Sequence, residues 1–310
     1  MDSEKNSFLT RTPVVVIGAF ICCVLWGSAF PCIKIGYKYF NISASDINTQ
    51  ILFAGIRFIL AGILALIIGS ILSKKILIPK RSSWIKILKL SMFQTVAQYI
   101  FFYIGLAKTT GVRASIVEAT NVFVAIIIAS LLFKQEKLTF RKMAGSVVGF
   151  VGVVIVSTIG AETVSGNYFI GDLLVFLSTV AYGFSSVLLK RYSSDDNPVI
   201  LSGYQFIIGG LIMTVIGVIF GGKFATITAS GIGMLFYLAM VSATAYSLWG
   251  ILIKYNTISR VAVFGFMNPV SGVILSVIML GEGSTLGIMS FVSLILVCIG
   301  IYIVNKKEQH

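Results

Sequence analysis

The chain has 310 residues, of which 57% are hydrophobic and only 11% are charged. A soluble domain carries about a quarter charged residues, so this composition excludes an ordinary soluble enzyme, and the abundance of apolar residues excludes a disordered chain. The formal net charge of +13 does not indicate nucleic-acid binding, because the basic residues lie between apolar runs rather than on a polar face. This composition indicates a protein whose apolar surface is embedded in a lipid membrane.

Apolar runs long enough to cross a membrane follow one another along the sequence. A helix crosses the ~30 Å hydrocarbon core in about 20 residues. A polar tail at 1–12 precedes the first run, which is too long for a signal peptide and is followed by further runs, so we expect an uncleaved first helix. The runs cover residues 13–35, 47–72, 84–106, 112–133, 140–159, 169–190, 200–220, 231–254, 260–280 and 285–304. They predict an all-α integral membrane protein with ten transmembrane helices.

The basic residues favour one orientation of these helices. With the amino terminus in the cytoplasm, eighteen of the 24 Lys and Arg residues fall in cytoplasmic segments and five in external ones. Cytoplasmic loops are enriched in basic residues, and the anionic inner leaflet attracts them. We therefore expect a multi-pass protein of the cell (plasma) membrane with both termini in the cytoplasm.

Landmarks of the first half recur in the second. Tyr99, Arg113 and Asn121 recur 147 residues later as Tyr246, Arg260 and Asn268. A repeat of five helices is odd, so the second copy enters the membrane from the opposite side and forms an inverted repeat. We predict a first repeat at 13–159, an external linker at 160–168, a second repeat at 169–304 and a cytoplasmic tail at 305–310.

Four short motifs lie in the first, second and ninth predicted helices. They are Trp26-Gly27-Ser28-Ala29-Phe30 followed by Lys34, Arg57-Phe58-Ile59-Leu60-Ala61, Asn268-Pro269, and Leu280-Gly281-Glu282. With these motifs the chain resembles the EamA-type transporters of the drug/metabolite transporter superfamily. Val122 departs from the family, which usually has a proline there, so we expect the fourth helix to be less kinked than the ninth. The resemblance implies a secondary transporter that works by alternating access, usually as an exporter of small metabolites, amino acids or toxic compounds.

Polar side chains within the predicted helices are candidates for a substrate or coupling site, because each is costly in lipid without a partner or a task. Glu118 and Arg57 can lie at similar depths. They either form a structural ion pair or separate to hold a substrate, and Glu118 is also a candidate acceptor of a coupling proton. The residues that we expect beside them in a central cavity are Asn121, Asn268, Gln94, Gln98, Trp26, Tyr99, Tyr182, Gln205, Tyr246 and Trp249. Near the helix ends, Lys34, Asp172, Glu136 and Glu282 are expected at the membrane interface.

Other functions lack their motifs. The single histidine is His310, and the chain has no P-loop, so neither a His-Glu-x-x-His metalloprotease, a histidine-dependent hydrolase nor an ATPase is expected. We expect no catalytic residue, metal or cofactor, and we expect the four cysteines to be small buried hydrophobes.

The expected partners are a small-molecule substrate, protons or another coupling ion, and membrane lipid, in a monomer or homodimer. Our first substrate class is a small polar or amphipathic metabolite such as an amino acid, with Glu118 binding the amine and Arg57 the carboxylate. The alternatives are an exporter of an organic cation or drug and, outside transport, a membrane scaffold or receptor.

Overall fold

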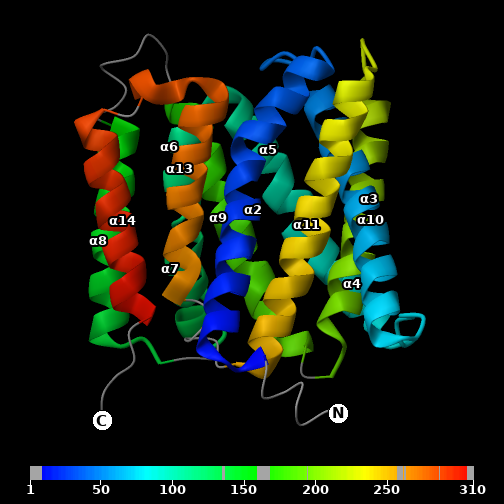
Figure 1. Ribbon diagram of the computed structural model, residues 1–310, viewed down its shortest axis with the longest axis horizontal. Helices are drawn as coiled ribbons and strands as arrows, with labels where there is room; N and C mark the ends of the chain where they lie inside the picture. Colours follow the sequence, from blue (N-terminus) through cyan, green and yellow to red (C-terminus); the bar gives the residue numbers. More distant parts are fainter. Residues whose placement is uncertain are drawn as a thin grey trace.

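The computed structural model describes residues 9–134, 137–158, 168–193, 195–256, 261, 263–285 and 287–305. These residues form ten helical passes that run side by side (Figure 1). The first half consists of α2 (Thr12–Tyr39), α3 (Ile47–Ser73), α4 (Ser83–Leu90) with η1 (Ser91–Ala97) and α5 (Gln98–Lys108), α6 (Gly111–Glu118) with α7 (Asn121–Ile127) and η2 (Ile128–Leu132), and α8 (Phe140–Thr158). The second half consists of α9 (Phe169–Tyr192), α10 (Pro198–Ile219), α11 (Ala229–Tyr255), η4 (Val263–Phe266) with α13 (Met267–Leu280), η5 (Glu282–Thr285), and α14 (Ile288–Asn305).

Length and composition suit these passes to a membrane. Among the described residues, seven helices are long and apolar enough to span one, and the segments Met267–Leu280 and Ile288–Val304 are shorter apolar helices. Several helices begin at a residue that satisfies the free backbone N–H groups of the first turn. The Asp46 side chain accepts from Thr49 N before α3, and the Thr110 side chain accepts from Arg113 N before α6.

The two halves run in opposite directions. Lys34, near the end of α2, donates a hydrogen bond of 2.6 Å to the Thr109 carbonyl. The Thr109 hydroxyl donates to Asp172, in the first turn of α9, also at 2.6 Å. The first pass of one half therefore ends where the first pass of the other half begins. The predicted fold class, two inverted five-helix repeats, is confirmed.

Glycines join equivalent helices of the two halves in two seams, α3 against α10 and α8 against α14. A β-carbon added at Gly62 would lie 2.5 Å from the Gly203 carbonyl oxygen, and one added at Gly145 would lie 2.8 Å from that of Gly300. Figure 1 shows the two seams at opposite flanks of the bundle. Such backbone contact needs small residues. Gly221 is different, because its φ of +88° ends α10 in a turn and its missing side chain faces open space.

The fourth pass is interrupted between Glu118 and Asn121, although Val122 stands where a proline would kink it. The Thr120 hydroxyl donates to the Val117 carbonyl at 2.8 Å, and Thr120 N donates to the same oxygen at 3.1 Å. Back-bonding of this kind competes with regular helical hydrogen bonds. The absence of proline therefore does not keep this pass regular.

Candidate functional site

The interruption in the fourth pass presents a carboxylate and an amide together. Glu118 is the last residue of α6, and Asn121 is the first residue of α7. Asn121 Nδ2 donates to Glu118 Oε1 at 2.7 Å, and Asn268 Nδ2, from α13 in the other half, faces Oε2 at 3.5 Å. Within the described part of the chain, no Lys or Arg lies at ion-pair distance from Glu118. The carboxylate is thus held by two amides at repeat-related positions and has no cationic partner there.

Tyrosines from three helices lie near this carboxylate, and two tryptophans extend the aromatic group. The Trp26 ring of α2 is 5.2 Å from that of Trp249 and 5.6 Å from that of Tyr246, both on α11. The hydroxyl groups of Tyr99, on α5, and Tyr246 are 3.2 Å apart. Tyr99, Tyr246 and Tyr182 of α9 all lie within electrostatic range of the carboxylate. Both halves of the chain therefore contribute to one group of aromatic and acidic side chains.

Exposure divides the predicted site residues into two groups. The half-buried group, which retains surface accessible to a ligand, consists of Glu118, Asn121, Asn268, Trp26, Tyr99, Tyr182, Tyr246 and Trp249. The second group is buried and consists of Arg57, Gln94, Gln98 and Gln205. Only the first group can contact a bound molecule without a rearrangement.

Arg57 is held by neutral acceptors. Its Nε donates to the Leu238 carbonyl at 3.2 Å, one terminal nitrogen donates to Ser242 Oγ at 2.9 Å, and the other donates to the Tyr103 hydroxyl. No ion pair joins it to Glu118 in the described residues, so the structural pair that we considered is not formed. The reason is the direction of the side chain, which points from α3 toward α5 and α11. Nothing in the sequence singled out Ser242 as its partner.

The three glutamines lie apart from the carboxylate. The Thr95 hydroxyl donates to Gln205 Oε1 at 2.5 Å, which joins η1 to α10. In the described residues, Gln94 Oε1, Gln98 Oε1 and Gln205 Nε2 are buried without a hydrogen-bond partner. These amides belong to a helix interface, and no hydrogen bond in the described part of the chain connects them to Glu118.

The end of the bundle at Thr109 contains a buried ion pair that was not expected. Arg113 Nε donates to Asp172 Oδ2 at 3.1 Å, and the two side chains are 4% and 3% exposed. Asp172 lies near the end of its pass, as expected, and the structure adds that it is buried and paired there. Both residues occupy the first turn of passes that start at this end, which is the signal that could have paired them.

Glu282 closes the same end from the second half. Its carboxylate accepts hydrogen bonds of 3.1 Å from Gly111 N and 3.0 Å from Val112 N. These N–H groups begin α6, where the helix dipole favours a negative charge. Glu136, its counterpart in the first half, lies outside the described residues. Glu282 thus caps a helix, a role more specific than the interfacial position we expected.

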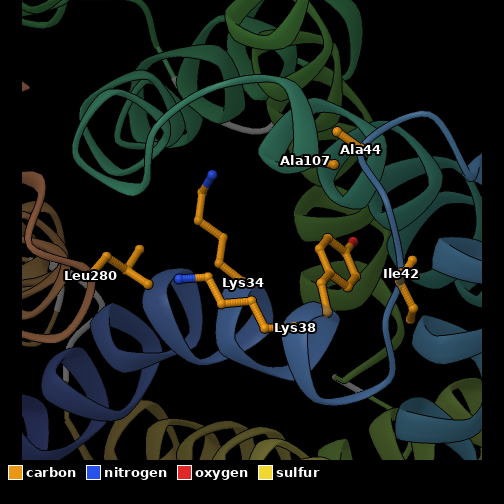
Figure 2. A pocket seen from close by; sticks show the side chains of 7 residues that line it. Lys34, Lys38, Ile42, Ala44, Ala107 and Leu280 are labelled. Carbon is orange, nitrogen blue, oxygen red and sulfur yellow. The ribbon is translucent and has the colours of Figure 1, made fainter. Parts of the chain in front are cut away.

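A cavity of about 220 Å³ opens beside α2 at this end of the bundle. Figure 2 shows Lys34 and Lys38 extending from α2, with Leu280 at one side and Ala107 at another. Lys34 is already engaged by the Thr109 carbonyl. The cavity is therefore basic and lies away from Glu118, which does not line it.

No group of three or more His, Cys, Asp or Glu residues that could hold a metal occurs in the part of the chain described. Cys22, Cys23 and Cys32 are buried free thiols. Cys22 Sγ and Cys23 Sγ each lie 3.5 Å from a backbone carbonyl, of Ala245 and Phe264. These three residues are buried as expected, whereas Cys298 is only half-buried, so the expectation does not hold for it.

Comparisons with known proteins agree with this architecture. The EamA-like transporter family matches residues 14–158 and again residues 169–306. An uncharacterized transporter of Archaeoglobus fulgidus is 27% identical over 91% of this chain and 95% of its own. The uncharacterized inner membrane transporter YedA of Escherichia coli is 24% identical over 93% and 92%. A crystal structure with 16% identity covers 94% of this chain and 97% of its own at a TM-score of 0.62, which supports the fold alone.

Proposed function

The chain belongs to the EamA-like transporter family, and we propose that it exports a small metabolite carrying an amine, by alternating access between its two halves. It is a multi-pass membrane transporter, and the observation that carries the finer proposal is Glu118. This carboxylate lies in the middle of a membrane pass, half-buried, and is held by Asn121 and Asn268 with no cation at ion-pair distance among the described residues. A cationic substrate group supplies the missing charge.

The aromatic side chains suit the same ligand. A cation over the face of Trp or Tyr is attracted by the ring quadrupole, most strongly when desolvated. The Trp26 ring contacts both Trp249 and Tyr246, and Tyr246 lies within electrostatic range of Glu118. In this proposal the amine binds between the carboxylate and these rings, and the two asparagines hold the carboxylate in place.

Amino acids remain the first substrate class, and organic cations or drugs are the second. Arg57 was our candidate for the substrate carboxylate, but its guanidinium is buried and bound by three acceptors from α5 and α11. This engagement favours substrates recognised by their amine alone. An amino acid and its decarboxylated amine therefore make a decisive pair of test compounds.

Glu118 also suits a coupling role, because a proton and a substrate amine compete for one carboxylate. Exchange of an inward proton for an outward amine then follows from mutually exclusive binding. We further propose that the repeats extend over 13–159 and 169–304. The bias of basic residues supports a cell-membrane protein with both termini in the cytoplasm. The relative YedA is named an inner membrane transporter.

Transport by purified protein in liposomes tests the proposal. We expect uptake into inside-out vesicles of an amine and of its parent amino acid, with loss of both in Glu118→Gln. Asp196→Asn is the matched control, because it also neutralises one carboxylate but lies in the loop between α9 and α10. Equal uptake by Glu118→Gln and the control would contradict the proposal. If the protein took up the amino acid but not the amine, this result would support Arg57 as the residue that binds the substrate carboxylate.

A further inference from the structure

The fourth and ninth passes are antiparallel, and three contacts define their register. A β-carbon at Gly111 would lie 2.5 Å from Ser276 Oγ, and one at Gly272 would lie 2.6 Å from Ser115 Cβ. Farther along, Glu118 faces Asn268. Residue numbers that rise by one turn along the fourth pass therefore face residue numbers that fall by one turn along the ninth. Continued by one turn, into η4 and past the interruption of the fourth pass, this register would bring Gly265 to the level of Asn121.

The internal repeat also relates Gly265 to Glu118. The offset of 147 residues that relates Asn121 to Asn268 also relates Glu118 to Gly265. The two asparagines are therefore duplicated around the centre of the bundle, whereas the carboxylate is present on one side only. On the other side the equivalent position has no side chain.

The space at Gly265 is open. A β-carbon there would meet no atom of the described residues within 4 Å, whereas at Gly27 and Gly272, in the same group of helices, it would collide with α13 and α6. Gly265 does not have a positive φ, so its backbone accepts any residue. Neither packing nor backbone conformation explains a glycine at this position.

We propose that Gly265 determines substrate specificity: its missing side chain leaves the space that receives the part of the substrate beyond the amine, and the unpaired arrangement selects compounds with one amine over diamines. This inference rests on the proposed function, since it takes the amine to bind Glu118. The asymmetry between an acidic and an empty position then orients the substrate in an otherwise symmetric centre.

Side chains of graded size at Gly265 test the inference in liposomes, with ethylamine, phenethylamine and 1,4-diaminobutane as probes. Gly265→Leu is expected to lower phenethylamine uptake at least about tenfold relative to ethylamine, since a few methylene groups in a tight pocket discriminate by this factor or more. Gly265→Ala should lower the same ratio less. Gly265→Glu, which restores the repeated carboxylate, should shift preference toward the diamine.

Gly233→Leu is the matched control, because Gly233 is an exposed glycine of α11 with equally open space. If Gly265→Leu does not yield monodisperse protein, two other measurements test the inference. They are the ratio of phenethylamine to ethylamine uptake by Gly265→Ala and the preference of Gly265→Glu for the diamine. Uptake ratios equal to wild type in these variants, with Glu118 still required, would overturn the role of Gly265 and leave the proposed function standing. Absence of amine uptake by the wild type would overturn both.

Discussion

Replacing Glu118 by glutamine removes one charge while it keeps the length of the side chain and one acceptor oxygen. That oxygen can still accept from Asn121, whose amide lies 2.7 Å away. A hydrogen bond to a charged group contributes about 1.5–3 kcal/mol and a neutral one about 1 kcal/mol, so the free energy of unfolding should fall by ~1 kcal/mol. The fold should survive the substitution.

The effect on substrate should be larger. Removing one partner of a desolvated charge pair costs about 2–5 kcal/mol, and 1.4 kcal/mol is a factor of ten, so the affinity for an amine should fall at least about 30-fold. Calorimetric titration of the purified protein with phenethylamine measures the affinity, and thermal unfolding in detergent measures the stability. If Glu118 also carries the coupling proton, uptake by Glu118→Gln should lose its dependence on a pH gradient while exchange of substrate across the membrane continues.

Two results would refute this reasoning. Wild-type affinity, transport and pH dependence in Glu118→Gln would exclude both the binding and the coupling role. Rescue of the variant by Arg57→Gln would show that the two charges depend on each other, which the contacts of Arg57 with Tyr103, Ser242 and Leu238 do not predict.

Three further predictions concern other parts of the chain. Asn121→Leu and Asn268→Leu should each impair transport with little loss of folded protein, because each removes a donor to Glu118; normal transport by both would make them structural amides. In a variant without native cysteines, a cysteine at Ile76, which is exposed in the same loop as the buried Leu77, should react with impermeant reagents only from the cytoplasm and one at Thr226 only from outside. The reverse pattern would invert the proposed orientation. A hydrogen bond from Ser83 and the ammonium of Lys86 lower the pKa of Asp196, so its stabilising effect is complete above its unfolded pKa of about 3.9 and is lost as the pH falls through the lower folded value. Asp196→Asn should thus lower the thermal midpoint in detergent at pH 7 relative to wild type, with the gap closing at acid pH; a gap that does not change with pH would assign no role to the ionised carboxylate.

Hydropathy predicts where the passes lie. The run at 47–72 corresponds to Ile47–Ser73, and the run at 169–190 to Phe169–Tyr192. The agreement has a physical cause, since a backbone in lipid must satisfy its hydrogen bonds within a helix and leave that helix where water begins. Repeat-related Asn121 and Asn268 were expected in one site, and both are found at Glu118.

The sequence did not predict how each helix is rotated about its axis. It also did not predict where the helices depart from regular α-helical geometry. A rise of 1.5 Å per residue gives the depth of Arg57 but not its direction, so its partners on α11 could not be named. The π-helical turns at Ser91–Ala97 and Ile128–Leu132 contain neither proline nor glycine as a marker. The first-turn positions of Arg113 and Asp172 place both residues at the same end of the bundle, but they do not show that the side chains turn inward and become buried.

The glycine contacts of the two seams limit which helices can move relative to one another. Helices whose backbones touch cannot rotate or separate without opening voids that lipid tails are too bulky to fill. If the protein works by the alternating access that we propose, we expect the pairs α3–α10 and α8–α14 to stay fixed. The helices between them would then make the movement that exposes Glu118 to one side and then to the other. The same contacts occupy the small-residue faces of α3, α8, α10 and α14, so a second copy that approached the α3–α10 seam would meet bulky aliphatic side chains such as the exposed Ile63 and Val215.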